Sequence, residues 1–279
     1  MNEEIEGKRK MTMDKKYDRP IQVAEGIHWV GFRDQGSNLT CNPYLVVQDD
    51  QAILIDSGSR TDFAGVMMKI LQTGVDPQNV IGLIYQHYDP DLCGSMSNFI
   101  DMCDNPNLKI ISEKRNNVFI SFYIPRDKYH LLDSIDAHDC TFAFNGRVLE
   151  FIPTPYAHSP GSFMTYDKKT KTLFTSDLFG SDATQWHLVL ELDEECFTCF
   201  DYGKCPKGKT ACPLKEILAF HKEMMPCGKA LRYAISKIKE MAIERIAPQH
   251  GSILHRQKDI SFVIEKLETL EEVGIDALL

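Results

Sequence analysis

Short apolar runs between turn residues predict most of the strands. The run at residues 80–85 is apolar almost throughout, as is typical of a buried strand. Asp49 and Asp50 separate two such runs and indicate a hairpin, and a second hairpin is expected around residues 167–169. Residues 118–153 read as β-rich throughout. The individual strands that we expect cover residues 27–30, 44–47, 52–55, 80–86, 108–111, 148–152, 163–166, 171–175 and 246–247.

Apolar residues at helical spacing predict the helices. In the first helix Val66, Met67 and Ile70 share one face, and Gly74 ends it. The segment 181–228 is rich in cysteine and is expected to be an irregular insertion. Each half of the chain holds strands with helices appended, which predicts an α/β fold with helices packed outside two sheets. The expected helices cover residues 63–72, 96–102, 229–243 and 259–270.

Composition narrows the class of protein. The chain has 279 residues, 43% hydrophobic, with a net charge of −9, which argues against a nucleic-acid or anionic-membrane partner. No apolar run is long enough to span a bilayer. Residues 1–20 are highly charged, and we expect a flexible arm before one domain over 21–279. The nine cysteines are an odd number, and without an export signal they favour reduced thiols and a cytoplasmic location.

Six potential metal ligands follow short apolar strands, each with Gly or Pro nearby. Three of them occur within five residues, directly after the strand at residues 80–86. Strand ends can deliver side chains to one rim of a pair of packed sheets, so these loops are expected to converge. Carboxylates and imidazoles form a hard oxygen and nitrogen ligand set, which favours iron or manganese over a thiolate zinc site. The six residues are His87, Asp89, Asp91, His158, Asp177 and His250.

These motifs resemble the metallo-β-lactamase superfamily, and within it the di-iron domain of flavodiiron proteins, over roughly residues 21–260. Hydrolase members carry His-x-His-x-Asp-His in the first loop, and the flavodiiron branch carries His-x-Glu-x-Asp-His. This chain reads His87-Tyr88-Asp89-Pro90-Asp91-Leu92, which is nearer the iron branch. The resemblance implies an αββα sandwich with the site at one edge. Asp56 matches an acid that supports the site without binding metal.

The resemblance also implies a ligand assignment. His87, Asp89, His158 and Asp177 would bind one iron, and Asp91, Asp177 and His250 would bind the other, with Asp177 bridging. Two departures stand out: Leu92 replaces the family's final His, which leaves an open position for a small molecule, and Asp89 is one methylene shorter than the family's Glu. If Leu92 instead lies beside a single metal, the site is mononuclear.

The same resemblance bears on the function. Flavodiiron proteins continue into a flavodoxin domain, but no FMN-binding loop is visible here, so no FMN is expected. This favours the small oxygen-binding di-iron proteins, with O2 or NO as ligand, a peroxo-type adduct, a sensor role and an unidentified signalling partner. The family implies a homodimer. No catalytic residue is assigned.

Three alternatives remain open from the sequence. The first is an O2 or NO reductase supplied by an external electron donor. The second is a zinc-dependent hydrolase, which Asp89 and Leu92 oppose. The third is a scaffold that folds without metal.

The cysteines and the remaining histidines have less specific patterns. Cys196, Cys199, Cys205 and Cys212 suggest either a second metal site or ordinary thiols in a loop, with a redox or docking role. Cys41, Cys93, Cys103 and Cys140 are expected to be small hydrophobic residues. His187 or His221 could reach the open iron position.

Overall fold

The computed structural model describes residues 17–31, 41–182, 186–199, 202, 204, 205, 208 and 211–279. Within them lie two sheets of seven strands each. In spatial order the first sheet contains β1 (Ile21–Ala24), β2 (Ile27–Trp29), β3 (Tyr44–Gln48), β4 (Gln51–Ile55), β5 (Val80–Ile84), β6 (Lys109–Ser112) and β7 (Leu132–Ser134). The second contains β12 (Val189–Leu190), β14 (Ile253–Leu254), β13 (Arg245–Ala247), β11 (Thr172–Phe174), β10 (Phe163–Asp167), β9 (Arg147–Pro153) and β8 (Thr141–Phe144).

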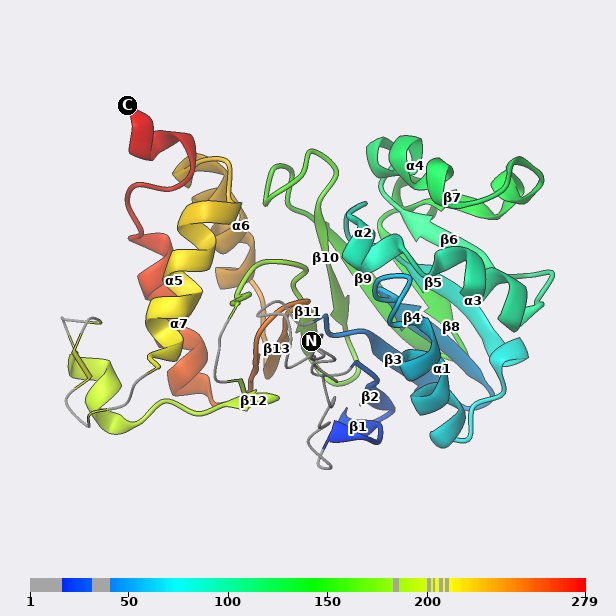
Figure 1. Cartoon of the computed structure of the whole chain (residues 1–279), viewed down its shortest axis with the longest axis horizontal. Coiled ribbons are helices and arrows are strands. Elements are labelled where there is room, and N and C mark those ends of the chain that lie inside the picture. The colour runs from blue at the N-terminus through cyan, green and yellow to red at the C-terminus, as the bar shows by residue number, and fades with distance from the viewer. Residues whose placement is uncertain are drawn as a thin grey trace, which may run out of the picture.

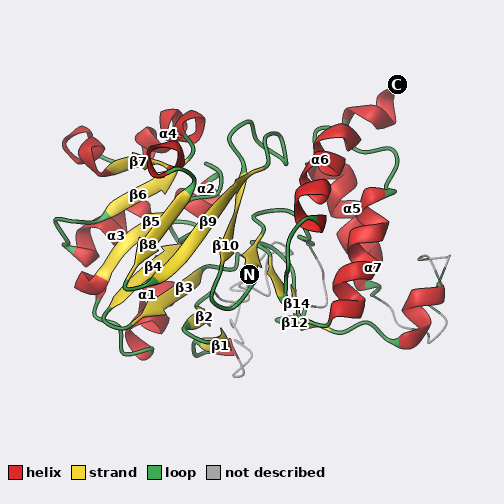
Figure 2. Cartoon of the chain, turned by 180° about the vertical axis from the view of Figure 1, so that it is seen from behind, coloured by secondary structure: helices red, strands yellow, loops and turns green. Residues whose placement is uncertain are grey.

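Helices cover the outer faces of both sheets, so the chain forms four layers (Figure 1). The helices beside the first sheet are α1 (Phe63–Gln72), α2 (Pro90–Cys93), α3 (Met96–Cys103) and α4 (Lys114–Ile120). Beside the second are α5 (Pro213–Met224), α6 (Gly228–Lys239) and α7 (Gln257–Glu268). Short 3-10 turns are η2 (Pro77–Asn79), η3 (Ser121–Tyr123), η4 (Arg126–Leu131), η5 (Ile135–His138), η6 (Glu194–Thr198) and η7 (Ile275–Leu278). The view from behind shows the same layers (Figure 2).

Strand alternation explains the layering. In β4, Ile53 and Ile55 face the core between the sheets, whereas Leu54 packs with the helices outside the first sheet. In β11, Phe174 faces the inner core and Leu173 packs beneath α5, α6 and α7. Successive side chains of a strand point to opposite faces, so one strand supplies two apolar layers. The predicted α/β sandwich with helices outside two sheets is confirmed.

Two predicted segments were wrong. Residues 118–131 are predicted to be β-rich but form the end of α4 and two 3-10 turns, because Ile120, Ile124 and Leu131 face the core at spacings of a helix rather than of a strand. The segment 181–228, which is predicted to be irregular, contains α5. This helix has Pro213 at its first position and buries Leu214, Ile217 and Phe220 on one face.

Most other boundaries agree within two residues, but α6 ends at Lys239 rather than near residue 243. The sequence did not predict β1, β12 and β14, because these strands are too short to show a clear alternation of polar and apolar residues. Residues 1–16 of the predicted arm lie outside the described residues. Tyr17, within the predicted arm, is buried and packs against Trp29 and Trp186.

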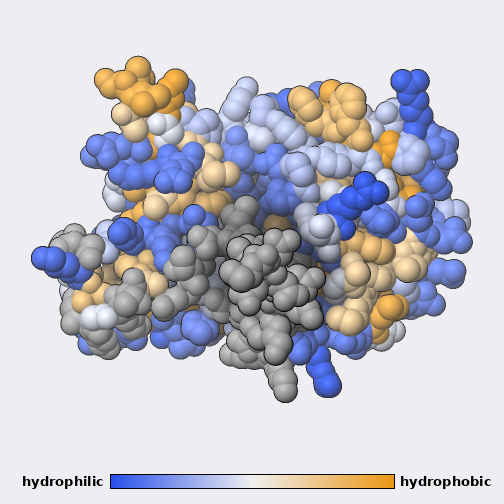
Figure 3. All heavy atoms as spheres, in the orientation of Figure 1, coloured by the Kyte–Doolittle hydropathy of each residue, from blue (hydrophilic) through white to orange (hydrophobic). Residues whose placement is uncertain are grey.

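No helix in the described part of the chain is long and apolar enough to cross a membrane. On the face shown in Figure 3, hydrophobic side chains lie in separate groups between hydrophilic ones.

Candidate metal centre

The topology of the second sheet brings three of the predicted residues to one edge. β9 and β11 both pair antiparallel with β10, so they run in the same direction, and β13 pairs parallel with β11. His158, Asp177 and His250 follow the ends of these three strands. They therefore arrive at the same edge of the sheet.

The first sheet supplies the other three from the loop after β5. Asp89 is extended and precedes α2, whose first position is Pro90. Proline has a fixed φ and lacks an N–H group that the first helical turn would leave unused, so it stabilises the start of this short helix. His87, Asp89 and Asp91 have ligand atoms within 4.8 Å of one another. All six predicted residues therefore meet across the edges of both sheets.

His87, Asp89 and His158 form the His87 cluster. The Nε2 atom of His158 lies 3.0 Å from Oδ2 of Asp89, and Nε2 of His87 lies 3.6 Å from the same oxygen. Ser176 Oγ lies 2.8 Å from Nδ1 of His87, which holds the ring so that Nε2 faces the carboxylates. His158 has a φ of 99°, a conformation that costs roughly 1–3 kcal/mol outside glycine and is tolerated where a site requires it.

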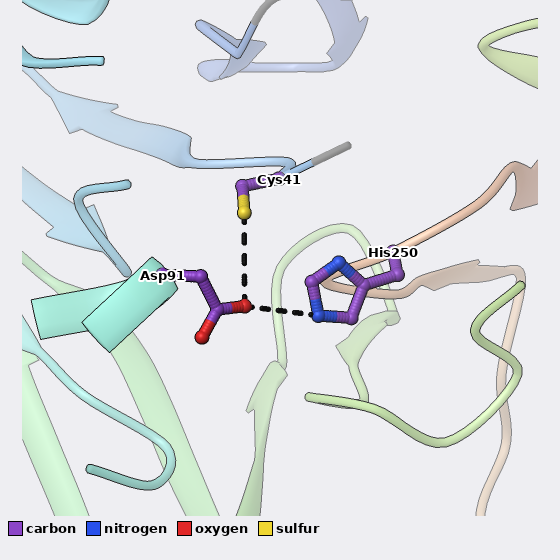
Figure 4. Close-up of side chains that lie close together, drawn as sticks. All are labelled: Cys41, Asp91 and His250. Carbon is purple, nitrogen blue, oxygen red and sulfur yellow. Dashed lines mark hydrogen bonds and ion pairs between the residues drawn. The ribbon is translucent and has the colours of Figure 1, made fainter. Parts of the chain in front are cut away.

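Asp91, His250 and Cys41 form the His250 cluster (Figure 4). Nε2 of His250 lies 3.1 Å from Oδ2 of Asp91, and the Cys41 sulfur lies 3.7 Å from that oxygen. Asp177 stands between the two clusters: Oδ1 is 3.7 Å from His250 Nε2 and 3.9 Å from His87 Nε2, and Oδ2 is 3.5 Å from His158 Nε2. One carboxylate is thus shared by two ligand groups.

The charges of the site are strongly coupled. Burial alone would lower the pKa of His87, but the carboxylates of Asp177, Asp89 and Asp91 outweigh it and raise this pKa to about 9. The pKa values of His158 and His250 are also raised, against the effect of burial, by Asp89 and by Asp91 respectively. Burial opposes ionisation of Asp89, but His158 and His87 hold its pKa below the usual range. In metal-free protein, the carboxylates of the site therefore pair with protonated histidines.

The shared carboxylate fits a metal ion. Asp177 is 2% exposed, and its Oδ1 is buried without a hydrogen-bond partner. A buried carboxylate oxygen without a hydrogen bond is costly unless a cation takes up its charge. Asp56 is also buried, and burial raises its pKa to about 7; its carboxylate accepts a hydrogen bond from the Gln86 amide at 3.3 Å and belongs to none of the ligand groups.

Cys41 is the site residue that the sequence reading missed, because it was expected to be an ordinary small hydrophobic residue. It precedes a strand instead of following one. The predicted hairpin contained the necessary signal, because β3 runs antiparallel to β4 and so begins at the edge where β4 ends. A residue just before β3 therefore lies at the same edge as residues just after β4 and β5.

The other candidate residues lie elsewhere. His221 is buried and uses both ring nitrogens locally, accepting from the Phe179 amide and lying 2.7 Å from the Ile217 carbonyl oxygen. His187 is exposed. The expectation was wrong for His221, whose ring nitrogens are both engaged, and stays a prediction for His187.

The cysteine-rich segment forms a separate pocket. Four of its cysteines line this pocket together with Leu192, Tyr202 and Leu214, and they are Cys196, Cys199, Cys205 and Cys212. Among the described residues, the groups of three with ligand-like spacing all lie at the edge of the two sheets. A second metal site at these cysteines stays a prediction.

The two sheets, the outer helices and the edge cluster define the metallo-β-lactamase-like fold found in flavodiiron proteins. The model of the family described as "ODP family beta lactamase" matches residues 39–251, more than half of the chain. The chain belongs to this family.

Curated relatives and solved structures agree with this. The chain is 31% identical over 233 residues to a diflavin flavoprotein of Synechocystis, and 27% identical over 258 residues to an uncharacterized protein of Methanocaldococcus jannaschii. A structure titled as the peroxy diiron species of chemotaxis sensor ODP superposes with a TM-score of 0.70 at 20% identity, covering 93% of this chain and 97% of that one. The rubredoxin oxygen:oxidoreductase of Desulfovibrio gigas superposes with a TM-score of 0.71 at 19% identity, covering 90% and 61%.

The matches cover only part of the curated relatives. They span 88% of this chain and 59% of the Methanocaldococcus protein, and 82% of this chain and 38% of the Synechocystis protein. A further relative, the anaerobic nitric oxide reductase flavorubredoxin of Pectobacterium atrosepticum, is 27% identical, with 72% of this chain and 42% of that protein aligned.

Proposed function

We propose that this protein is a non-haem di-iron protein that binds O2 or NO and acts as an oxygen sensor in signalling. The observation that carries the proposal is the shared carboxylate, Asp177, between two ligand clusters. Relatives named for di-iron and nitric oxide chemistry support the metal and the class of ligand.

The proposed assignment gives each cluster one ion. His87, Asp89 and His158 would hold the first, Asp91 and His250 the second, and Asp177 both. Two ferrous ions held there would supply electrons and a coordination position for a diatomic gas. The protein's own part is to concentrate negative charge at Asp89 and Asp91, to orient His87 through Ser176, and to bury Asp177 and His250 away from water.

The sensor role is supported by the family description, ODP, which is also the name of the chemotaxis sensor in a matched di-iron structure. The alternative is an O2 or NO reductase supplied by an external electron donor. A signalling partner or donor, a homodimer and a cytoplasmic location complete the proposal.

The test is to load metal-free protein with Fe(II) under anaerobic conditions, count the iron, and then add air while recording the visible spectrum. About two irons per chain and a charge-transfer band that persists without reductant support the sensor. Two irons with rapid conversion to a plain diferric spectrum, followed by sustained consumption of O2 or NO when an electron-donor system is added, would support the reductase instead. Binding of zinc with ester or phosphodiester cleavage would overturn both in favour of a hydrolase.

A further inference from the structure

The ligand set of the His250 cluster is one residue short by comparison with the first-loop motif of flavodiiron proteins. Leu92 occupies the position of that motif's final His. It is fully buried in the apolar cluster outside the first sheet, with Tyr85 and Met96. Its carbonyl oxygen accepts hydrogen bonds from the Ser57 amide and hydroxyl, which hold this part of the loop in place. Position 92 therefore belongs to the core and supplies no ligand.

The sulfur of Cys41 lies on the side of Asp91 that faces His250. In Figure 4 the three side chains point toward one another, and their ligand atoms all lie within 4.8 Å of one another. Two ligands that each lie about 2.0–2.3 Å from one ion are separated by about 3–4 Å. The distances of 3.7 Å from Sγ to Asp91 and 3.1 Å from His250 to Asp91 both fall in this range.

The backbone beside Cys41 is fixed to the loop that carries His250. The Asn42 amide donates to the Gln249 carbonyl at 2.8 Å, and its side-chain nitrogen donates to the carbonyls of Pro248 at 3.1 Å and Gly251 at 2.9 Å. The Asn42 side-chain oxygen accepts from Trp29 Nε1 at 2.9 Å. Asn42 is fully buried, so this network sets the distance between Cys41 and His250 before any metal binds.

A second, independent feature points to a ligand at the same place. Asp177 Oδ1 is buried, has no hydrogen-bond partner, and lies 3.7 Å from His250 Nε2. This oxygen lies between the two clusters, since it is also 3.9 Å from His87 Nε2, so it can bind an ion held by Asp91, His250 and Cys41.

We propose that Cys41 is a thiolate ligand of the second metal position, completing a set with Asp91, Asp177 and His250. This inference rests on the proposed di-metal centre and specifies its second position. On binding, the thiol proton passes to solvent and a sulfur–metal bond forms, with no change of oxidation state. The two positions are then chemically unequal: the first has only nitrogen and oxygen ligands, and the second adds one soft sulfur.

Cobalt(II) tests this directly, because thiolate ligation gives cobalt an intense near-ultraviolet charge-transfer band that nitrogen and oxygen ligands do not give. Metal-free protein is titrated with cobalt(II) alone, and the absorbance and bound cobalt are followed together. The variants are Cys41→Ala and Cys41→Ser, and the control is Cys140→Ser, a half-buried cysteine that belongs to none of the ligand groups. Unfolding of each metal-free variant is measured to confirm that it folds.

We expect the wild type and Cys140→Ser to show the band as the second cobalt binds. Cys41→Ala should lose the band and bind the second cobalt at least about tenfold more weakly, with the first unaffected. If two cobalt ions bind without the band, or if the band survives in Cys41→Ala when Cys199→Ser and Cys205→Ser have removed thiols from the cysteine-lined pocket, the Cys41 inference is wrong while the di-metal centre stands. If wild-type protein binds no second cobalt, the di-metal centre itself fails.

Discussion

The two halves of the site share Asp177 but are built differently. The His87 cluster contains nitrogen and oxygen ligands only, and all its members follow strands. The His250 cluster contains a sulfur, contributed by Cys41, which precedes β3 in the first sheet instead of following a strand. Exposure does not distinguish them, because His87 is 1% and Asp89 32% exposed in the first cluster, and His250 is 3% and Asp91 27% exposed in the second. One fold edge can therefore offer two metal positions of unequal chemistry.

The largest effect is expected from Asp177→Asn, because this residue serves both clusters. The amide keeps the shape but loses the negative charge, so both ions should bind at least about a hundredfold more weakly. Calorimetric titration with Fe(II) or cobalt(II) measures this. Loss of only one ion would show that Asp177 does not bridge.

Removing one imidazole at a time should separate the clusters. His158→Ala is expected to abolish the first binding event and leave the sulfur band of the second, whereas His250→Ala should do the reverse. The measurement is bound cobalt per chain together with the spectrum of each variant. If both variants lost both ions equally, the two positions would not be independent.

The substitution Leu92→His tests whether a histidine at this position can replace the Cys41 sulfur as a ligand of the second metal. The imidazole would enter an apolar cluster without a partner, so the free energy of unfolding should fall by about 2–4 kcal/mol. Urea unfolding of metal-free protein measures this change. Tighter binding of the second metal would contradict our placement of residue 92.

The pH dependence should differ between metal-free and metal-loaded protein. The pKa of His87 rises from 6.5 to about 9 on folding, so its ion pairs stabilise the fold fully below about pH 6.5 and are lost as the pH rises through 9. The pKa of Asp89 is lowered, so its contribution is present above 3.8 and is lost on acidification. Denaturant midpoints of metal-free protein should therefore fall from about pH 6 to pH 9, and His87→Ala should flatten this slope.

Metal-loaded protein should instead become more stable from pH 6 to pH 9, because its ligands carry no protons whereas the unfolded histidines and Cys41 bind protons at the lower pH. Equal midpoints at pH 6 and pH 9 in metal-free protein would contradict the charge pairing.

The smallest effect is expected from Ser176→Ala. It removes the hydroxyl 2.8 Å from His87 Nδ1, so the first metal should bind about 10–100-fold more weakly and the second should be unchanged. Titration at both positions provides the control within one sample. An equal loss of metal affinity at the second position would show that Ser176 supports both metal positions.

The strand ends made most of the fold and site predictable. Runs such as residues 52–55 and 80–84 are apolar and short, and the acids and histidines after them mark the edge of the sheets. Residues 114–131 were not predictable in this way, because Val118 and Phe119 favour strands but are exposed on a helix. Cys41 was missed because its role depends on which sheet edge β3 begins at, a property of topology and not of local sequence.

The candidate centre also straddles the seam between two sheets, since His87 and Asp91 come from one sheet and His158 and His250 from the other. A bound ion would then hold the edges of the two sheets together. Metal binding would therefore be thermodynamically coupled to folding. A hundredfold excess of metal over its dissociation constant would add about 2.7 kcal/mol to the free energy of unfolding. Under iron scarcity the sandwich would loosen first at this seam, so the stability of the protein would itself register the iron supply.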